Sequence, residues 1–227
     1  KVFIEQLLTN GTTTALVFCS VHPESVDALF TEAQKHNMRI IAGKVMMDRN
    51  APDKVLDTAQ TSYEQSKQLI QRWQGVDRLQ YAVTTRFAPT STDEQLAAAG
   101  RLLAEHDGVY LHTHLAENAD EIEWVKRLFP KAKNYLDVYD QASLLGKRSV
   151  FAHSLHLCDS ECERLAQTDS AIAHCPTSNM FIGSGLFPMQ TLQQHGIKIG
   201  MGTDVGGGTS FNMLPTLADG YKMQPLS

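Results

Sequence analysis

Histidine, glutamate and aspartate side chains follow several short apolar runs of this sequence, at positions where they could act together. They are His112, His114, Glu117, His153, His174 and Asp204. Imidazole and carboxylate groups bind Zn²⁺ or Fe²⁺ and can leave one coordination position open to water. A bound divalent ion lowers the pKa of that water towards ~7 and supplies hydroxide at neutral pH. The residue types therefore predict metal-dependent hydrolysis.

His112 and His114 stand two residues apart on one predicted strand, so both side chains point to the same face and could bind one metal ion. The alternative is that one of the two rings is packed or hydrogen-bonded in the core. Glu117 follows at the corner between strand and helix, within reach of a water on the metal, as a general acid/base requires. Alternatively, Glu117 is a helix N-terminal residue favoured by the helix dipole.

His153 and Asp204 follow two later predicted strands. His153 ends an apolar run and emerges at the rim of the sheet, although a lone histidine there can also be a satisfied core residue. Asp204 lies between Gly202 and a run of three glycines, which would let a ligand approach closely; alternatively, the aspartate caps the next turn. His174 could bind a ligand or hold the turn at Pro176. The residues alone leave these alternatives open.

The elements that must position these side chains alternate between short β-branched runs and longer helical patterns. The predicted strands cover residues 12–19, 38–45, 78–84, 109–115, 149–154, 170–175 and 197–203. The predicted helices cover residues 1–8, 23–36, 62–73, 92–105, 118–129, 135–145, 159–167 and 188–195. This alternation predicts an α/β fold of βα units around a parallel sheet. Seven predicted strands after a leading helix favour a (β/α)8 TIM-type barrel. An open sheet is the alternative, although the dinucleotide fingerprint that often accompanies it fails at Val205.

The length and composition limit the class of protein. With 227 residues, the chain is expected to be one partial barrel over 1–227, formed by strands 2 to 8, with no second domain. The net charge of −5 gives no basic field for nucleic acid or anionic lipid. No apolar run approaches the ~20 residues that cross a bilayer, and four cysteines without a pairing pattern favour a reducing, cytoplasmic location. Residues 46–60 lack a clear period and are a candidate lid or a loop at the barrel mouth.

Several of these segments resemble known motifs. The sequence His-Leu-Ala-Glu-Asn at 114–118, Ala-His at 152–153, His-Cys-Pro-Thr-Ser-Asn at 174–179 and Gly-Thr-Asp at 202–204 resemble the amidohydrolase superfamily, in its metal-dependent deaminase branch. Arg86-Phe87 and the Asn-Tyr to Val-Tyr segment at 134–139 narrow the resemblance to the guanine deaminase family. It extends over nearly the whole chain. It implies the metal-dependent hydrolase barrel, here without its first strand and its outer β-sandwich.

The resemblance implies hydrolytic deamination of guanine to xanthine and ammonia, in purine catabolism or salvage. It implies that His114 and Asp204 are zinc ligands and that Asp204 also accepts a proton from the metal water. Glu117 would carry that proton to the purine ring and then to the departing amine. His153 would hold the attacking oxygen and stabilise the alkoxide of the tetrahedral adduct. His112 is then no ligand, and its role is packing or support of the site.

The same resemblance implies a substrate pocket and partners. Arg86 would hydrogen-bond the purine oxygen and ring nitrogen, Phe87 would pack on the base, and His153 would also contact substrate. We expect a small-molecule purine substrate, a homodimer, and Zn²⁺ or Fe²⁺ as the metal. The family's further His-x-His pair lies outside this chain, so we expect activity of the parent protein and none of the chain alone. The alternatives are an amidohydrolase acting on cytosine, a triazine or another aminopurine, and a metal-free scaffold.

Overall fold

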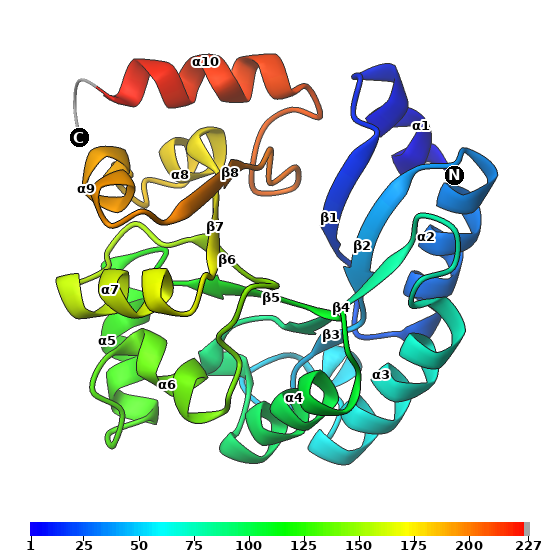
Figure 1. Cartoon of the computed structure of the whole chain (residues 1–227), viewed down its shortest axis with the longest axis horizontal. Coiled ribbons are helices and arrows are strands. Elements are labelled where there is room, and N and C mark those ends of the chain that lie inside the picture. Colours follow the sequence, from blue (N-terminus) through cyan, green and yellow to red (C-terminus); the bar gives the residue numbers. More distant parts are fainter. Residues whose placement is uncertain (225–227) are drawn as a thin grey trace. The chain divides into compact units, whose positions relative to one another are not determined.

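The computed structural model describes residues 1–224, which form two compact units (Figure 1). The first unit comprises residues Lys1–Thr113 and Tyr139–Leu144. The second comprises His114–Val138 and the rest of the described chain from Leu145. Residues 225–227, the last three of the predicted barrel over 1–227, lie outside the described residues.

The first unit contains parallel strands and the helices that cover them. Its strands are β1 (Thr14–Phe18), β2 (Arg39–Gly43), β3 (Val45–Met46), β4 (Gln80–Thr85) and most of β5 (Tyr110–Leu115). Its helices are α1 (Val2–Thr9), α2 (Pro23–Lys35), α3 (Ala59–Trp73) and α4 (Asp93–Glu105), with the short 3₁₀ helices η1 (Asp53–Val55) and η2 (Ala88–Thr90). The strands follow the order β1-β2-β4-β5, and β3 also pairs with β4. In Figure 1, α2 and α3 flank these strands.

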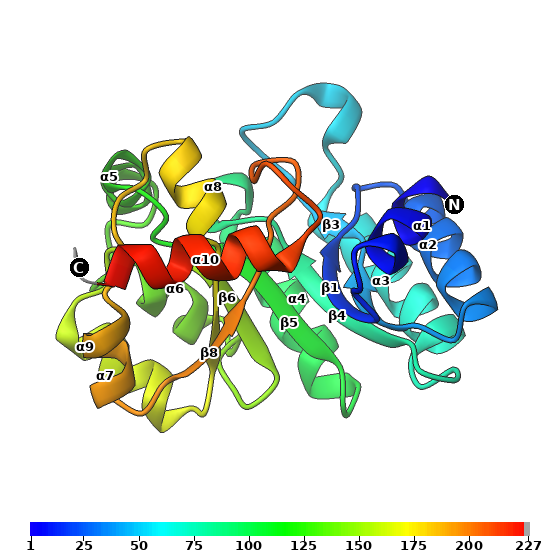
Figure 2. The same cartoon turned by 90° about the horizontal axis from the view of Figure 1, so that it is seen from above.

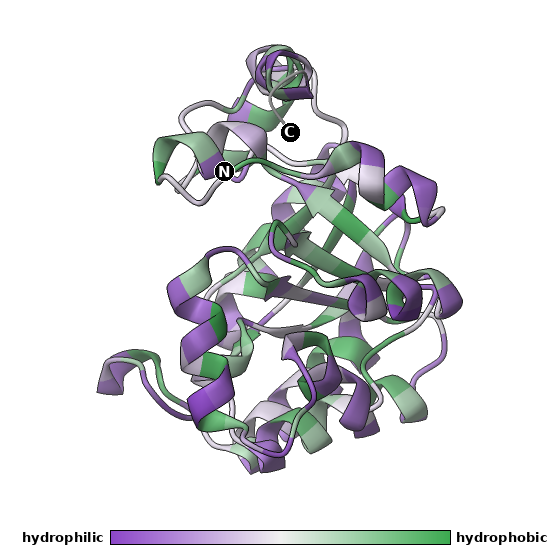
Figure 3. Ribbon diagram, turned by 90° about the vertical axis from the view of Figure 1, so that its left-hand side faces the viewer, coloured by the Kyte–Doolittle hydropathy of each residue, from purple (hydrophilic) through white to green (hydrophobic). Residues whose placement is uncertain are grey.

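Local sequence explains where these helices begin and which face they bury. Pro23 occupies the first turn of α2, where backbone N–H groups have no partner within the helix, so that the missing N–H of proline costs no hydrogen bond. The α2 residues Val26 and Phe30 are wholly buried, four positions apart on one face. Helix α3 begins after Thr58, whose side chain accepts a hydrogen bond from Thr61 N. Figure 3 shows the resulting alternation of hydrophilic and hydrophobic bands along the helices.

The second unit repeats the strand-helix alternation. It contains the end of β5, followed by α5 (Ala119–Leu128), the start of α6 (Tyr135–Gln141), β6 (Ser149–His153), α7 (Asp159–Gln167), β7 (Ala171–His174), α8 (Pro176–Phe181), α9 (Met189–Gln194), β8 (Lys198–Met201) and α10 (Met213–Met223). Strands β6, β7 and β8 are parallel neighbours in that order. Helix α10 lies against α8, where Thr177 Oγ1 donates a hydrogen bond to Asp219 Oδ2 at 3.2 Å (Figure 2).

The predicted elements agree closely with those observed. Six of the seven predicted strands contain an observed one, and the strand predicted over 78–84 overlaps β4, which ends one residue later at Thr85. Each predicted helix overlaps an observed one, although α3 begins at Ala59 rather than at residue 62 and α6 ends at Gln141 rather than at residue 145. Helices α8 and α10 were not predicted. The apolar residues Leu214, Leu217 and Tyr221 of α10 are exposed, and the helix instead buries Thr216, Gly220 and Met223. Within residues 1–224 no helix combines the length and apolar character needed to cross a membrane.

Candidate active site

The ends of β5 and β6 bring three of the predicted site residues together in the second unit. His114, the penultimate residue of β5, stacks its ring on that of His153, the last residue of β6, with 5.2 Å between the ring centroids. Glu117 Oε1 lies 3.4 Å from Nδ1 of His153. Glu117 precedes Asn118, the N-cap of α5, and so is not part of the first helical turn.

Asp204 lies near the same group of side chains, because both Asp204 and Glu117 act electrostatically on the buried thiol of Cys175. The Cys175 thiol is buried directly after β7, and burial raises its pKa well above the ordinary value. The negative charges of Asp204 and Glu117 raise that pKa further, so both carboxylates lie near the thiol. Cys175 is thus a protonated packing residue, and the structure gathers His114, Glu117, His153 and Asp204 in one region of the second unit.

The backbone is strained at the same strand ends. Ala116, His153, Ser154 and Asp204 adopt positive φ angles of 46°, 68°, 56° and 48°. Such conformations of residues other than glycine cost of order 1–3 kcal/mol each and concentrate at functional sites. Hydrogen bonds from Ser154 N to Leu115 O at 2.8 Å and from Leu155 N to Ala116 O at 3.1 Å hold two of these corners against each other. Four of the nine non-glycine residues with positive φ in the described chain therefore lie at these strand ends.

The loop after β8 holds the backbone of Asp204 and leaves its carboxylate unused by the turn. The backbone N–H groups of Gly207 and Gly208 donate to the main-chain oxygen of Asp204, so the turn is capped by backbone rather than by the carboxylate. A Cβ atom on Gly207 would lie 2.8 Å from Asp204 Oδ2 and 3.0 Å from Ser178 Oγ. Glycine at 207 therefore leaves room beside a carboxylate that its turn does not use.

His153 is electrically neutral at physiological pH. Burial lowers its pKa, and the neighbouring His114 imidazole lowers it further, from 6.5 to about 3. A neutral imidazole carries one N–H donor and one acceptor nitrogen. His153 can therefore donate one hydrogen bond to a reacting oxygen without first being protonated.

Buried polar atoms without a hydrogen-bond partner form what we call the open cluster. Within the described part of the second unit, all such side-chain atoms belong to residues that follow or end β6 and β7: Ser154 Oγ, both ring nitrogens of His174, Ser178 Oγ, Asn179 Oδ1 and Ser184 Oγ. Buried polar groups are nearly always paired, so a concentration of exceptions indicates room for the polar atoms of a ligand or of water. His174 makes no hydrogen bond to the Pro176 turn and instead stacks on Phe187, with 3.9 Å between the ring centroids.

The predicted substrate residues Arg86 and Phe87 lie in the first unit, directly after β4. The Arg86 guanidinium is exposed and sits 5.2 Å from the centre of the Phe87 ring, a cation-π distance. Arg86 N donates to Met46 O at 3.4 Å, and Ala88 N donates to the hydroxyl of Tyr139 at 2.8 Å. The backbone on both sides of Phe87 is thus held while the guanidinium remains accessible.

A second buried polar group, which we call the closed network, holds the residue 46–60 segment in the first unit. Lys44 is fully buried and forms an ion pair with Asp57. Asp57 Oδ1 also accepts hydrogen bonds from Met47 N at 3.2 Å and from Gln95 Nε2 at 2.9 Å. Gln95 Nε2 donates in addition to Ser62 Oγ at 2.9 Å. Whether this segment moves as a lid remains a prediction, and its base is fixed by these contacts.

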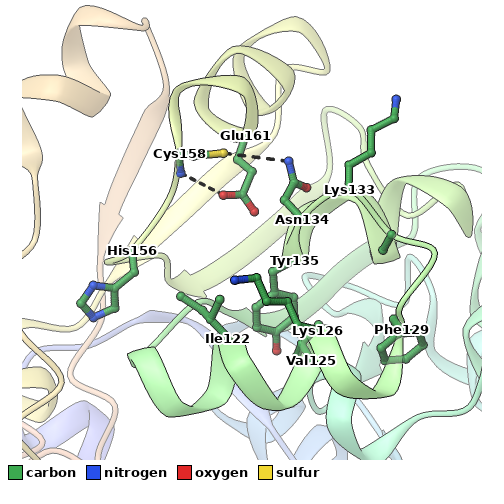
Figure 4. A pocket seen from close by; sticks show the side chains of 11 residues that line it. Ile122, Val125, Lys126, Phe129, Lys133, Asn134, Tyr135, His156, Cys158 and Glu161 are labelled. Carbon is green, nitrogen blue, oxygen red and sulfur yellow. Dashed lines mark hydrogen bonds between the residues drawn. The ribbon is translucent and has the colours of Figure 1, made fainter.

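Figure 4 shows a separate cavity of about 210 Å³ beside α5 and α7 in the second unit. Its carboxylate Glu161 accepts hydrogen bonds from Leu136 N at 3.0 Å and Cys158 N at 2.9 Å. Nearby, Glu121 accepts from the hydroxyl of Tyr135 at 2.6 Å. These carboxylates are therefore engaged in helix capping and packing.

The donor atoms present suit a divalent metal only in part. No group of three or more histidine, cysteine, aspartate or glutamate side chains within residues 1–224 could hold a metal ion by itself. His114 and Asp204 supply one imidazole and one carboxylate, donors that Zn²⁺ and Fe²⁺ accept, and the space beside Gly207 keeps the carboxylate accessible. His114 and Asp204 therefore fit as part of a larger ligand set.

His112 packs its ring on Phe18 in the first unit, with 3.8 Å between the ring centroids, in agreement with a packing role.

Comparison with known proteins identifies the family. The model of the amidohydrolase family matches residues 1–227. The chain belongs to the amidohydrolase family. Guanine deaminase of Escherichia coli (strain K12) is 61% identical over 224 residues, which cover 99% of this chain and 51% of that protein. A probable guanine deaminase of Deinococcus radiodurans is 43% identical, with the same coverage.

Solved structures support this membership of the amidohydrolase family. The E. coli guanine deaminase structure matches with a TM-score of 0.97 and 61% identity, covering 99% of this chain and 53% of that one. The guanine deaminase structure from C. acetobutylicum, with guanine bound in its active site, gives a TM-score of 0.96 at 30% identity, covering 99% and 54%. The predicted α/β fold class and the resemblance to guanine deaminases are confirmed. The chain spans about half the length of the curated relatives it matches.

Sequence reasoning on this amidohydrolase missed one member of the site. Asn179 ends the His-Cys-Pro-Thr-Ser-Asn segment, and the sequence alone predicts no role for it. In the structure its amide nitrogen lies 2.9 Å from Nδ1 of His153, and both side chains are buried. The only available signal was a polar residue shortly after the strand that ends in His174, and such residues are too common to single out.

Proposed function

We propose that the whole protein converts guanine and water to xanthine and ammonia. The observation that carries this proposal is the convergence of Glu117 and His153 with the ligand candidates His114 and Asp204 on strained strand ends. The name of the 61% identical E. coli relative supports the choice of guanine among aminated heterocycles. The alternative substrates cytosine and triazines gain no support from the relatives named above.

His114 and Asp204 would hold a divalent metal, with Zn²⁺ the expected ion and Fe²⁺ accepted by the same donors. That ion would make a water molecule nucleophilic at neutral pH by lowering its pKa towards ~7. Oxygen attack at guanine C2 and cleavage of the bond to the exocyclic nitrogen then give xanthine and ammonia.

Glu117 moves the proton in this proposal. Its carboxylate lies 3.4 Å from His153 and is 17% exposed, so it is neither sealed in the core nor freely solvated. It would take a proton from the attacking water, pass it to the purine ring and then to the leaving amine. The neutral His153 would donate a hydrogen bond to the oxygen that becomes negatively charged.

Arg86 and Phe87 would recognise the purine. An exposed guanidinium beside an aromatic face can donate hydrogen bonds to the purine oxygen and ring nitrogen while the ring packs on the base. We further propose a free purine rather than nucleic acid as the substrate, because the net charge is −5. A cytoplasmic location and a homodimer complete the proposal.

Steady-state kinetics of the purified whole protein test the substrate assignment. Guanine, adenine, cytosine and a triazine amine would be compared by ammonia release, with xanthine identified as the guanine product. We expect kcat/KM to be highest for guanine. Equal or faster turnover of another amine would overturn the assignment, and a metal content far below one ion per chain with no turnover would support a scaffold instead.

Arg86→Ala tests the recognition site. Loss of a charge-assisted hydrogen bond of about 1.5–3 kcal/mol should raise KM for guanine roughly 10- to 100-fold and relax discrimination among purines. Arg101→Ala is the matched control, because Arg101 also lies over an aromatic ring of the first unit, that of Tyr63, at 4.6 Å. The control should leave KM unchanged. An unchanged KM in Arg86→Ala would remove Arg86 from the substrate pocket.

A further inference from the structure

We propose that Asn179 is a positioning residue that fixes the proton of His153 on Nε2, so that His153 presents an N–H to the reacting oxygen. This inference rests on the proposed function for its catalytic consequence. Its structural part, the position of the ring proton, stands on the geometry of the second unit alone.

The hydrogen bond between the two side chains sets the direction of donation. Asn179 Nδ2 lies 2.9 Å from His153 Nδ1, and the two residues are 0% and 1% exposed. An amide nitrogen can only donate, so Nδ1 must accept. A neutral imidazole that accepts at Nδ1 carries its hydrogen on Nε2. The remaining ring nitrogen is therefore a donor.

Glu117 competes for the same nitrogen. Its Oε1 lies 3.4 Å from His153 Nδ1, and a carboxylate at that place favours a proton on Nδ1 rather than on Nε2. The amide nitrogen of Asn179 lies 2.9 Å from Nδ1 and is therefore 0.5 Å closer than the carboxylate oxygen at 3.4 Å. Asn179 therefore decides between two forms of the ring, and it keeps His153 from taking up the role of proton partner to Glu117.

The backbone holds Asn179 in the orientation that this role requires. Asn179 N donates to Cys175 O at 2.9 Å, and Ser184 N donates to Asn179 O at 2.8 Å. On the other side, the positive φ of His153 is held through the bond from Ser154 N to Leu115 O. Both partners are thus placed by main-chain contacts, so the side-chain bond between them is available to orient the imidazole rather than to hold the chain together.

Asn179→Asp is the sharpest test, because it preserves shape and replaces the amide donor by an acceptor. In the zinc-loaded whole protein we expect kcat for guanine to fall on the order of 10²-fold or more, with KM and metal content unchanged. Nuclear magnetic resonance of ¹⁵N-histidine protein reports which ring nitrogen carries hydrogen. The His153 signals, assigned with His153→Gln, should change from Nε2–H in the wild type to Nδ1–H in the variant.

Two further variants keep the test decisive if Asn179→Asp does not fold. Asn179→Ala removes the donor without adding charge, and the nearby Glu117 should then draw the proton to Nδ1. Asn212→Asp is the matched control, since its side-chain oxygen accepts from Leu214 N at 2.9 Å in either form. It should leave kcat and the His153 signals unchanged.

The outcomes separate this inference from the proposed function. A wild-type His153 with hydrogen on Nδ1, or an Asn179→Ala variant with unchanged signals and unchanged kcat, would overturn the role of Asn179. A wild-type protein that does not turn over guanine would overturn the proposed function. In that case the ring signals would still decide whether Asn179 fixes the imidazole.

Discussion

The closed network of the first unit and the open cluster of the second are both buried and polar, but within residues 1–224 the polar atoms of the network are hydrogen-bonded and those of the cluster are not. In the closed network the Asp57 carboxylate accepts from Lys44, Gln95 and Met47, and the Ser62 hydroxyl accepts from Gln95. In the open cluster, Ser178 and His174 are equally buried and have no hydrogen-bond partner among the described residues.

The difference indicates what each group is for. A saturated buried network contributes to stability and holds a segment in place, whereas removal of one member leaves the others unpaired. Unpaired buried groups cost stability and persist where something else uses them. The open cluster lies beside the strained residues Ala116 and His153, so unpaired polar groups and backbone strain, which both cost folding free energy, occur together at the candidate site.

The largest expected effect is on catalysis at the second unit. Glu117→Gln should lower turnover of guanine on the order of 10²- to 10⁴-fold, because it removes a proton carrier while preserving shape. Metal content should stay near normal, and the free energy of unfolding should change little. Glu123→Gln, on the exposed face of α5, is the control and should retain full turnover. If turnover in Glu117→Gln equals that of the wild type, Glu117 is not the proton shuttle.

Breaking the closed network should instead affect stability. Lys44→Met leaves the largely buried Asp57 carboxylate without its cation and should lower the free energy of unfolding by about 3–5 kcal/mol. Lys126→Met removes an exposed ion pair with Glu123 and should cost no more than about 0.5 kcal/mol. Urea denaturation measures both. Similar small losses in the two variants would show that the network is not structurally important.

The pH dependence of stability should distinguish the open cluster further. Burial lowers the pKa of His174 from 6.5 to about 4, so the unfolded chain takes up this proton first as the pH falls. The free energy of unfolding is therefore unaffected by this group above pH 6.5. Between pH 6.5 and pH 4 it falls, and His174 accounts for a loss of about 3 kcal/mol. His174→Phe can keep the stack on Phe187 and should lose less stability over that range. Parallel pH curves for the two proteins would contradict this role of burial.

The smallest expected effect comes from comparing one buried serine of the closed network with one of the open cluster. Ser62 and Ser178 are both fully buried helical serines. The Ser62 hydroxyl accepts a hydrogen bond from Gln95, whereas the Ser178 hydroxyl has no partner in the part of the chain that the structure describes. Ser62→Ala should cost about 1 kcal/mol, since it leaves a donor of Gln95 less well satisfied. Ser178→Ala should be neutral or slightly stabilising. A loss of equal size at both positions, measured by thermal unfolding, would erase the distinction between the two groups.

Much of the architecture could be predicted because it is encoded locally. The apolar runs determined the strands, and residues placed at their ends, such as His114 and His153, met as the parallel arrangement requires. The bond from Asn179 to His153 could not be predicted, since it joins residues 26 positions apart through side-chain geometry. The same holds for the closed network, in which Lys44 and Asp57 are ordinary charged residues until the fold buries them.

The missing side chain at Gly207 sets a limit on redesign. Any substitution there would press on the Asp204 carboxylate before it met a substrate, because an added Cβ would already lie 2.8 Å from Oδ2. Laboratory evolution towards other heterocycles should therefore accumulate changes around Arg86, whose guanidinium has room to be replaced, and leave residue 207 untouched. Under the proposed function, reactivity and selectivity would then be separable targets in the whole protein.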